Sequence, residues 1–307
     1  MLENCNLCPR SCGTDREHGH TGFCQCTDRP LVSAICAHKG EEPVLSGEKG
    51  VCNVFFAHCN MQCCYCQNID ISQNQSNICR YCSLDTVVQR IAEVLPNTEN
   101  LLGFVSPSHQ AHLIPLIIER LHGMGLHPTT IYNTNAYDSV ETLRMLEPYI
   151  DIYLPDFKYS DNGLARRYSQ TSDYFEKATA ALTEMYRQKG STLITDNREI
   201  ATSGIIIRHL VLPGCVDNSK NALSWIAENL SINVHLSLMA QYYPPEKAGI
   251  INDELNRFVR TEEYNAVCSH SHALGFHRGW EQELTQQIVY QPHFENTNSF
   301  EQNQSTL

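Results

Sequence analysis

Thirteen of the 15 cysteines lie within the first 82 residues, so the fold of this part of the chain depends on what those thiols bind. Disulfides explain such crowding in small secreted domains, but a chain of 307 residues can bury a sizeable core without them. Residues 1–5 also lack the charged and apolar regions of a signal peptide. Bound metal is therefore the better explanation, and we expect a cytoplasmic protein.

The chain divides by composition into three expected parts. Residues 1–48 are rich in Cys, Gly and charge and show little apolar periodicity, which predicts a small metal-binding lobe. Residues 49–280 carry regular apolar runs and predict the main domain. Residues 281–307 form a polar tail, which we expect to be disordered from Phe294 onward.

In the main domain, short apolar runs alternate with amphipathic stretches. The runs predict six strands, at Val51–Ala57, Leu101–Val105, Thr129–Asn133, Ile152–Pro155, Ile205–Leu212 and Val234–Met239. The stretches predict six helices, at Leu84–Leu95, Leu113–Gly123, Val140–Tyr149, Tyr174–Lys189, Ala222–Leu230 and Glu262–Leu274. Ser139 is a candidate helix start and Gly190 a candidate stop.

This alternation predicts an α/β fold whose parallel strands are joined by right-handed helical crossovers. The pattern does not choose between an open doubly wound sheet and a barrel. Both architectures place ligands at the carboxyl ends of the strands, so we expect the chemistry just after each apolar run.

The composition argues against two kinds of partner. A formal net charge of −12 opposes the wide capture of a nucleic-acid backbone, which needs a positive field. No run approaches the roughly 20 apolar residues that a membrane-spanning helix needs. We therefore expect neither nucleic acid nor a membrane as a partner.

A short cysteine motif begins where the first predicted strand ends. Cys59, Cys63 and Cys66 have the spacing C-x3-C-x2-C. Thiolates are the usual ligands of iron–sulfur clusters, and a [4Fe-4S] cubane held by three of them keeps one iron open for a substrate or cofactor. A structural zinc ion would need a fourth ligand, for which the chain offers Cys64, Cys52 or Cys79. The adjacent Cys63 and Cys64 point in different directions, which disfavours zinc.

This motif, with Tyr65 before its third cysteine, resembles the cluster loop of the radical S-adenosylmethionine superfamily. Further strings narrow the resemblance to the PflX-like group, which is similar to pyruvate formate-lyase activating enzyme. They are Cys5-Asn6-Leu7-Cys8-Pro9-Arg10-Ser11-Cys12, Gly40-Glu41-Glu42-Pro43, Tyr132-Asn133-Thr134-Asn135, Tyr153-Leu154-Pro155-Asp156-Phe157-Lys158-Tyr159 and Arg208-His209-Leu210-Val211-Leu212-Pro213-Gly214. The resemblance covers residues 5–280, with the motifs in the family's order.

The resemblance implies a partial (β/α)6 barrel, in agreement with the six predicted βα units, and an oxidoreductase with a [4Fe-4S] cluster. In that family the open iron binds S-adenosylmethionine, and one electron from the cluster cleaves the sulfonium to methionine and a 5′-deoxyadenosyl radical, which abstracts hydrogen from a substrate. The implied partners are S-adenosylmethionine, an electron donor such as flavodoxin or ferredoxin, and a substrate that is either a protein, such as a glycyl radical enzyme, or a small molecule.

The resemblance also assigns cofactor contacts at the strand ends. Asn133, Thr134 and Asn135 resemble the motif that holds the ribose, although an Asp is typical of the activases where this chain has Asn133. Asp156 and Lys158 resemble the family's cation and carboxylate contacts, and a buried salt bridge is the alternative.

Arg208 matches an arginine that helps hold the methionyl carboxylate, and a core-capping arginine is the alternative. The chain departs from the family at the amino-group contact. Where the activases have Gly-Gly-Glu, it has Val105-Ser106-Pro107-Ser108-His109. That contact stays unassigned, and its candidates are Ser106, Ser108 and His109, with Gln241 as a weaker cofactor candidate.

Four further cysteines form a second candidate metal site. Cys5, Cys8, Cys12 and Cys24 have the spacing C-x2-C-x3-C-x11-C. Four thiolates close either a zinc site or a second [4Fe-4S] cluster, and the spacing does not choose between them, although a structural metal is very slightly favoured. We expect free thiols at the other cysteines of this region, Cys26, Cys36, Cys52, Cys64, Cys79 and Cys82.

Two other classes of function stay open from the sequence. One is a metal-ordered interaction or electron-transfer protein without S-adenosylmethionine chemistry. The other is a radical enzyme that modifies nucleic acid, which the acidic charge disfavours. The substrate itself cannot be assigned, because a fold does not fix a substrate.

Overall fold

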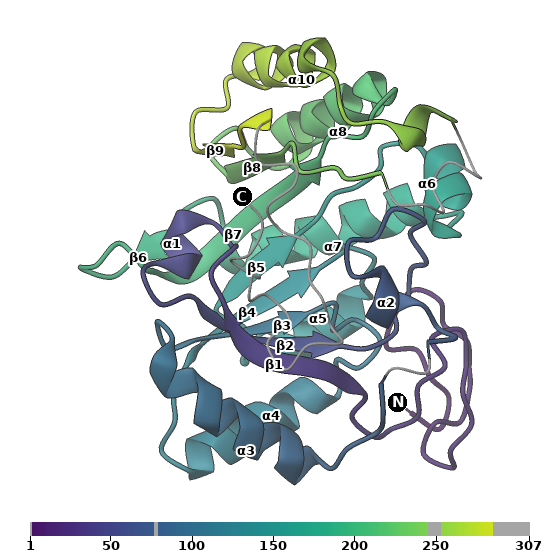
Figure 1. The fold of residues 1–307 in the computed structure, drawn as a ribbon, viewed down its shortest axis with the longest axis vertical. Coiled ribbons are helices and arrows are strands. Elements are labelled where there is room, and N and C mark those ends of the chain that lie inside the picture. The colour runs from purple at the N-terminus through teal and green to yellow at the C-terminus, as the bar shows by residue number, and fades with distance from the viewer. Residues whose placement is uncertain (1, 77–78, 245–252, 285–307) are drawn as a thin grey trace, which may run out of the picture.

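The computed structural model describes residues 2–76, 79–244 and 253–284, and a nine-stranded sheet runs through its centre (Figure 1). The strand order is β1-β2-β3-β4-β5-β7-β8-β9, and β6 pairs with β7 beside this path. The strands are β1 Val32–His38, β2 Val51–Phe56, β3 Leu101–Val105, β4 Thr129–Thr134, β5 Ile152–Pro155, β6 Ile194–Thr195, β7 Ala201–Leu210, β8 His235–Met239 and β9 Gly279–Glu281. Pairs from β2 to β9 along the path are parallel, whereas β1 and β6 pair antiparallel.

The larger helices connect these strands and pack on the outer face of the curved sheet (Figure 1). The α-helices are α1 Pro43–Ser46, α2 Ile69–Ser72, α3 Leu84–Val94, α4 Leu113–Gly123, α5 Val140–Leu146, α6 Asn162–Ser169, α7 Tyr174–Lys189, α8 Val216–Asn229 and α10 Thr261–Leu274, with short 3-10 helices at Leu95–Asn97 and Asp253–Asn256. None of the helices in this part of the chain is both long and apolar enough to cross a membrane.

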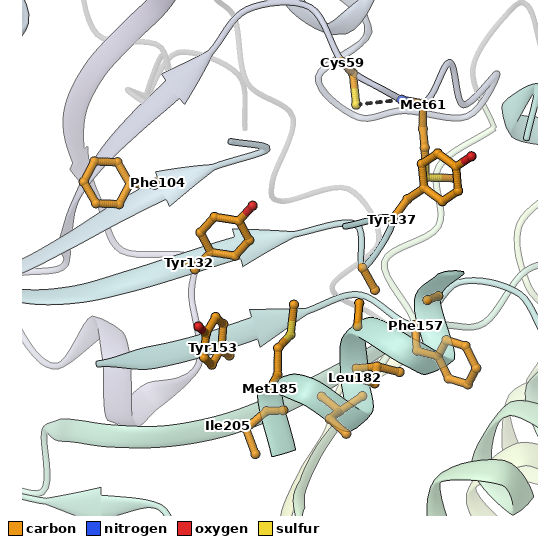
Figure 2. Close-up of a cluster of buried hydrophobic side chains, with 14 of the residues drawn as sticks. Cys59, Met61, Phe104, Tyr132, Tyr137, Tyr153, Phe157, Leu182, Met185 and Ile205 are labelled. Atoms are coloured by element: carbon orange, nitrogen blue, oxygen red, sulfur yellow. Dashed lines mark hydrogen bonds between the residues drawn. The ribbon is translucent and has the colours of Figure 1, made fainter. Parts of the chain in front are cut away.

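The core lies between the sheet and these helices. Tyr132 of β4 and Tyr153 of β5 pack edge to face with ring centroids 6.0 Å apart. Figure 2 shows both rings facing Leu182 and Met185 of α7, and all four side chains are buried. Burial of large apolar and aromatic side chains is the main term that favours folding, so this layer fixes β4 and β5 against α7.

The α/β fold and the partial barrel expected from the sequence are confirmed. All six predicted strands and all six predicted helices are present, with shifts at the ends: β7 begins at Ala201 and α8 at Val216, earlier than predicted. Ser139 caps α5, where its Oγ lies 3.4 Å from the Thr142 nitrogen, and Gly190 ends α7. The sheet stays open between its edge strands β1 and β9 within the described residues.

The structure adds elements that apolar periodicity did not predict. Strand β1 lies within the expected amino-terminal lobe, yet it pairs antiparallel with β2 and so joins that lobe to the sheet. Strand β9 extends the parallel sheet beyond β8. The polar tail expected after Phe294 lies outside the described residues.

Candidate active site

The carboxyl ends of the parallel strands surround a cavity of about 520 Å³. Its walls include residues within two positions of a strand end: Ser106 after β3, Asn135 after β4, Asp156 after β5 and Gln241 after β8. Parallel α/β sheets bind their ligands at this edge. The cavity therefore lies where the sequence predicts the chemistry.

The loop after β2 brings the three predicted cluster ligands to this cavity. Cys59, Cys63 and Cys66 all line it, whereas the neighbouring Cys64 does not. Burial raises the pKa of the Cys63 thiol to about 11 and that of Cys59 higher still, and the other thiols of the set add to both shifts. Without metal these groups are therefore protonated at neutral pH, and a metal that binds them must displace their protons.

The arrangement of these thiols suits a cluster. Among the described residues, no three His, Cys, Asp or Glu side chains converge as ligands of a single metal ion. Zinc needs its ligands to meet at one point, whereas the thiolates of an iron–sulfur cubane are spread over several irons. Cys52, one candidate for a fourth zinc ligand, is buried inside β2, and Cys79 packs near Phe55. Three thiols around one cavity supply the donor set that a [4Fe-4S] cluster could use, and neither Cys52 nor Cys79 is among the residues that line this cavity.

Backbone hydrogen bonds from distant residues hold the cysteine loop. The Cys64 nitrogen donates to the carbonyl of Tyr168 at 2.8 Å, and the Gln62 nitrogen donates to that of Ser169 at 3.3 Å. Both acceptors lie at the end of α6. The shape of the loop therefore depends on the docking of α6.

Hydrogen bonds from neighbouring residues reach the sulfurs of Cys59 and Cys63. The Ser169 hydroxyl lies 3.0 Å from Cys63 Sγ, and the Asn135 amide nitrogen lies 3.4 Å from Cys59 Sγ. Figure 2 shows the third contact, in which the Met61 backbone nitrogen donates to Cys59 Sγ at 3.4 Å. Hydrogen bonds to ligand sulfurs tune the potential of an iron–sulfur cluster.

The predicted ribose motif lines the cavity, but its three side chains differ in their contacts. Thr134 Oγ1 donates to the carboxylate of Asp138, which lies under β4. The Asn135 amide bonds Asn60 Oδ1 at 2.9 Å, besides Cys59 Sγ. The half-buried side chain of Asn133 has no hydrogen-bond partner among the described residues. Asn133 is therefore the member best placed to bind a hydroxyl of a ligand.

Asp156 and Lys158 meet at the cavity wall. Lys158 Nζ lies 2.7 Å from Asp156 Oδ2, so the two form the salt bridge considered as the alternative to a cofactor role. The other carboxylate oxygen, Asp156 Oδ1, is buried without a hydrogen-bond partner in the described part of the chain. A buried acceptor without a partner is costly, so this oxygen fits a donor group of a bound ligand.

Arg208 of β7 also lines the cavity, but it is already paired with carboxylates. Its Nε lies 2.8 Å from Glu42 Oε1, and its Nη2 contacts both Glu41 and Glu42. Burial alone would raise the pKa of Glu41, but the charge and hydrogen bond of Arg208, with smaller contributions from His38 and Asn53, together outweigh burial and lower that pKa to about 2. The resemblance assigned Arg208 without these partners, because nothing in the sequence places two residues 166 and 167 positions away beside it.

The residues considered for the amino-group contact separate in the structure. Ser106 and Gln241 line the main cavity. Ser108 lies under β4, where its Oγ is 3.2 Å from Thr134 Oγ1. His109 lines a different, smaller cavity near the amino terminus. Of the Ser106, Ser108 and His109 set, only Ser106 therefore faces the same space as the cysteine loop.

The smaller cavity brings together the second set of cysteines. Cys5, Cys8, Cys12 and Cys24 all line it, although Cys24 is 12 residues from the nearest of the others in the sequence. All fifteen cysteines of the chain are free thiols, so no disulfide accounts for their crowding.

Comparison with known proteins supports the family and the fold. No protein-family model matches the chain. The uncharacterized protein MJ0674 of Methanocaldococcus jannaschii is 30% identical over 269 residues, which cover 86% of this chain and 72% of that protein.

Solved structures with a similar fold include Streptococcus suis SuiB bound to the precursor peptide SuiA, with a TM-score of 0.50 and 11% identity over 74% of this chain and 47% of SuiB. SuiB bound to S-adenosylmethionine gives a TM-score of 0.49 and 12% identity over 76% of this chain and 50% of SuiB. The chain thus spans about half the length of SuiB.

Proposed function

Because this chain belongs to the same family as the uncharacterized protein MJ0674 of Methanocaldococcus jannaschii and its fold is similar to that of SuiB, we propose that it is a radical S-adenosylmethionine enzyme. One observation carries the proposal. The three thiols of the C-x3-C-x2-C motif line the same cavity as Asn133 and the Asp156–Lys158 pair, which come from different strands.

The residues of this cavity fit the expected cofactors. Three buried thiols supply the donor set of a [4Fe-4S] cluster with one open iron, and the unpartnered Asp156 Oδ1 supplies an acceptor for a cationic or hydroxyl donor. When bound, the cluster supplies the single electron that cleaves the sulfonium of S-adenosylmethionine. The chain's own residues bind and orient that molecule.

We assign the binding roles by charge and contact. Lys158 lines the same cavity as the cysteine loop, its charge lowers the pKa of Cys63 against the larger effect of burial, and it suits a carboxylate. Asn133 suits the ribose hydroxyls. Arg208 is held by Glu41 and Glu42, so we assign it to the cavity wall together with its two carboxylates.

Buried tyrosines close one side of the cysteine loop. The hydroxyls of Tyr65 and Tyr159 lie 2.6 Å apart, and Tyr159 reaches Ser169 Oγ at 2.7 Å, which in turn contacts Cys63 Sγ. This wall excludes water from the sulfur side of the site. A reactive radical requires such a dry environment.

The finer assignments form part of the proposal. The strings that resemble the PflX-like group support an activating enzyme, with a glycyl radical enzyme as one candidate substrate and flavodoxin or ferredoxin as the electron donor. Fifteen free thiols fit a reducing cytoplasm.

The test measures 5′-deoxyadenosine release. The protein is purified without oxygen, reconstituted with iron and sulfide, reduced with dithionite and mixed with S-adenosylmethionine. We expect wild-type protein to release 5′-deoxyadenosine and Cys63→Ala to release none, because the substitution removes a cluster ligand.

Cys64→Ala is the matched control, since Cys64 is adjacent in sequence but does not line the cavity. It should retain the activity. Zinc without iron in the wild-type protein, together with no release, would contradict the proposal and leave a metal-ordered interaction protein.

A further inference from the structure

The amino-terminal lobe encloses a second, small cavity that four cysteines line, together with apolar side chains such as Leu7 and Phe23 and with Arg16 and His109. Cys5, Cys8 and Cys24 are buried there, and Cys12 closes it on the solvent side with an exposed thiol. All four thiols line one space. Four cysteine thiolates are the usual donor set of an iron–sulfur cluster.

A buried positive charge lies against this cavity. Arg16 is 1% exposed, and it donates to the carbonyls of Thr27 at 3.0 Å and His109 at 2.7 Å and to Cys5 Sγ at 3.7 Å. These acceptors are two backbone carbonyls and one thiol. A buried guanidinium is strongly unfavourable unless negative charge lies beside it. The thiols of this lobe are the groups whose negative charge acts on Arg16, so thiolates bound to a cluster would stabilise its buried charge.

A buried nitrogen also lacks a partner at this cavity. His109 is 1% exposed, and its Nε2 lies 2.8 Å from the carbonyl oxygen of Ala57. Its Nδ1 has no hydrogen-bond partner within the described residues, although the ring lines the cavity. An unsatisfied buried polar atom points to a missing group. A metal centre in the cavity would face this imidazole.

The two metal sites share a wall. Asn60, which follows the cluster ligand Cys59, lines the second cavity, and Ala57 at the start of the same loop accepts the bond from His109. Arg10 of the lobe contacts this loop, because its Nε donates a hydrogen bond to the Asn60 carbonyl oxygen at 2.9 Å. The second cavity therefore lies between the exposed Cys12 and the loop that carries the first site.

We propose that Cys5, Cys8, Cys12 and Cys24 hold a second [4Fe-4S] cluster, which carries electrons from the protein surface to the first. One electron from a low-potential donor protein of the flavodoxin or ferredoxin class reduces the second cluster, and the same electron then reduces the first, so that no bond is made or broken in the transfer. The presence of the second cluster does not depend on the proposed function. Its role as an electron relay to the first cluster rests on that function.

The test counts metal in protein reconstituted without oxygen. Wild-type protein should hold about eight irons and eight sulfides per chain, and Cys8→Ala and Cys24→Ala should each lose about four of both. Cys36→Ala in β1, which lines neither cavity, should lose none. The paramagnetic resonance signal of the reduced wild-type protein should contain two components, of which Cys24→Ala retains one.

Several outcomes would overturn the proposal. One zinc per chain that Cys8→Ala removes, with about four irons retained, would make the site structural. A wild-type count of about four irons that Cys63→Ala abolishes would show that only the first site holds a cluster.

One outcome separates this proposal from the proposed function. If Cys63→Ala loses the irons of the first site and keeps about four, the second cluster is supported even if no 5′-deoxyadenosine forms.

The relay role has its own readout. In Cys24→Ala, reduction of the remaining cluster by flavodoxin hydroquinone should slow markedly, while reduction by dithionite, a small reductant, continues. Equal rates with flavodoxin in wild-type and Cys24→Ala protein would overturn the relay. The wild-type metal count does not depend on whether any variant folds.

Discussion

Three consecutive residues at the end of β4 show how much the role of a side chain depends on its direction. Asn133, Thr134 and Asn135 match one motif and all line the cavity, yet the hydroxyl of Thr134 is already bonded to Asp138. Asn135 instead supports the cysteine loop through Asn60. Only the side-chain amide of Asn133 has no hydrogen-bond partner among the described residues. The three positions should therefore respond differently to substitution.

We predict that substitution of two asparagines of this motif affects two different quantities, ligand affinity and stability. Asn133→Ala should raise the Kd for S-adenosylmethionine about threefold to tenfold, the value of one hydrogen bond, and leave the unfolding free energy unchanged. Asn135→Ala should lower the unfolding free energy by about 1–3 kcal/mol, because Asn60 Oδ1 loses its donor. Calorimetric titration and urea unfolding under argon measure the two quantities. Equal effects of both substitutions on Kd alone would contradict this division.

At the scale of elements, the helices owe their positions to one buried face. In α4, Leu113, Ile114, Ile117, Ile118 and Leu121 are buried, whereas Leu116 is 44% exposed. The spacing follows the helical period. Helix α4 should therefore tolerate change on one face and not on the other.

Neighbouring residues of α4 provide a matched test. Ile117→Ala should lower the unfolding free energy by about 2–5 kcal/mol, because it leaves a cavity in the core. Leu116→Ala should change it by less than about 0.5 kcal/mol. Urea unfolding of both variants measures the difference, and a similar loss in the two would show that α4 does not pack as described.

Elements with strong periodicity could be predicted from the sequence, and elements without it could not. The apolar run of β2 and the amphipathic α4 lie at their predicted places. Strand β1 was missed because its short run lies among cysteines and glycines, and α6 because its residues are mostly polar. Periodicity is visible only where one face of an element is consistently apolar.

The candidate site divides in the same way. Local strings predicted Cys59, Cys63 and Cys66 as cluster ligands from their spacing, and the structure places all three at one cavity. The pairing of Arg208 with Glu41 joins residues 167 positions apart, and no local pattern contains it. Contacts of this kind arise from the fold, so they were outside the reach of the sequence.

At the scale of the whole molecule, that same pairing connects β7 to the segment between the first two strands of the sheet. Arg208 lies in β7, while Glu41 and Glu42 come from the segment between β1 and β2. The side chains are almost fully buried, so loss of either charge would leave the other without compensation. The stability of the molecule should therefore depend on pH through these carboxylates.

We predict that Glu41 gives the protein part of its resistance to acid. Its pKa in the folded state, about 2, is below its usual value, so Glu41 stabilises the fold by about 3 kcal/mol above pH 4.5 and loses this contribution as pH falls toward 2. In Glu41→Gln, the drop in unfolding free energy between pH 7 and pH 3 should be smaller by about 2 kcal/mol.

Urea unfolding at the two pH values measures this difference. Glu93→Gln is the control, because Glu93 forms an exposed pair with Arg90 at 2.9 Å. Its pH dependence should match that of the wild type. An unchanged pH profile in Glu41→Gln would show that Arg208 does not hold Glu41 charged.

The hydrogen bonds of the cysteine loop set the order of events during synthesis of the chain. Cys63 meets its partner Ser169 only after 106 further residues have been translated, which takes about 5–20 s at usual ribosome speeds. During this interval the thiols have emerged but lack the docked α6 that shapes their loop. We therefore expect the proposed cluster to be inserted only after the later half of the chain has been made. Until then the free thiols depend on a reducing environment to avoid oxidation.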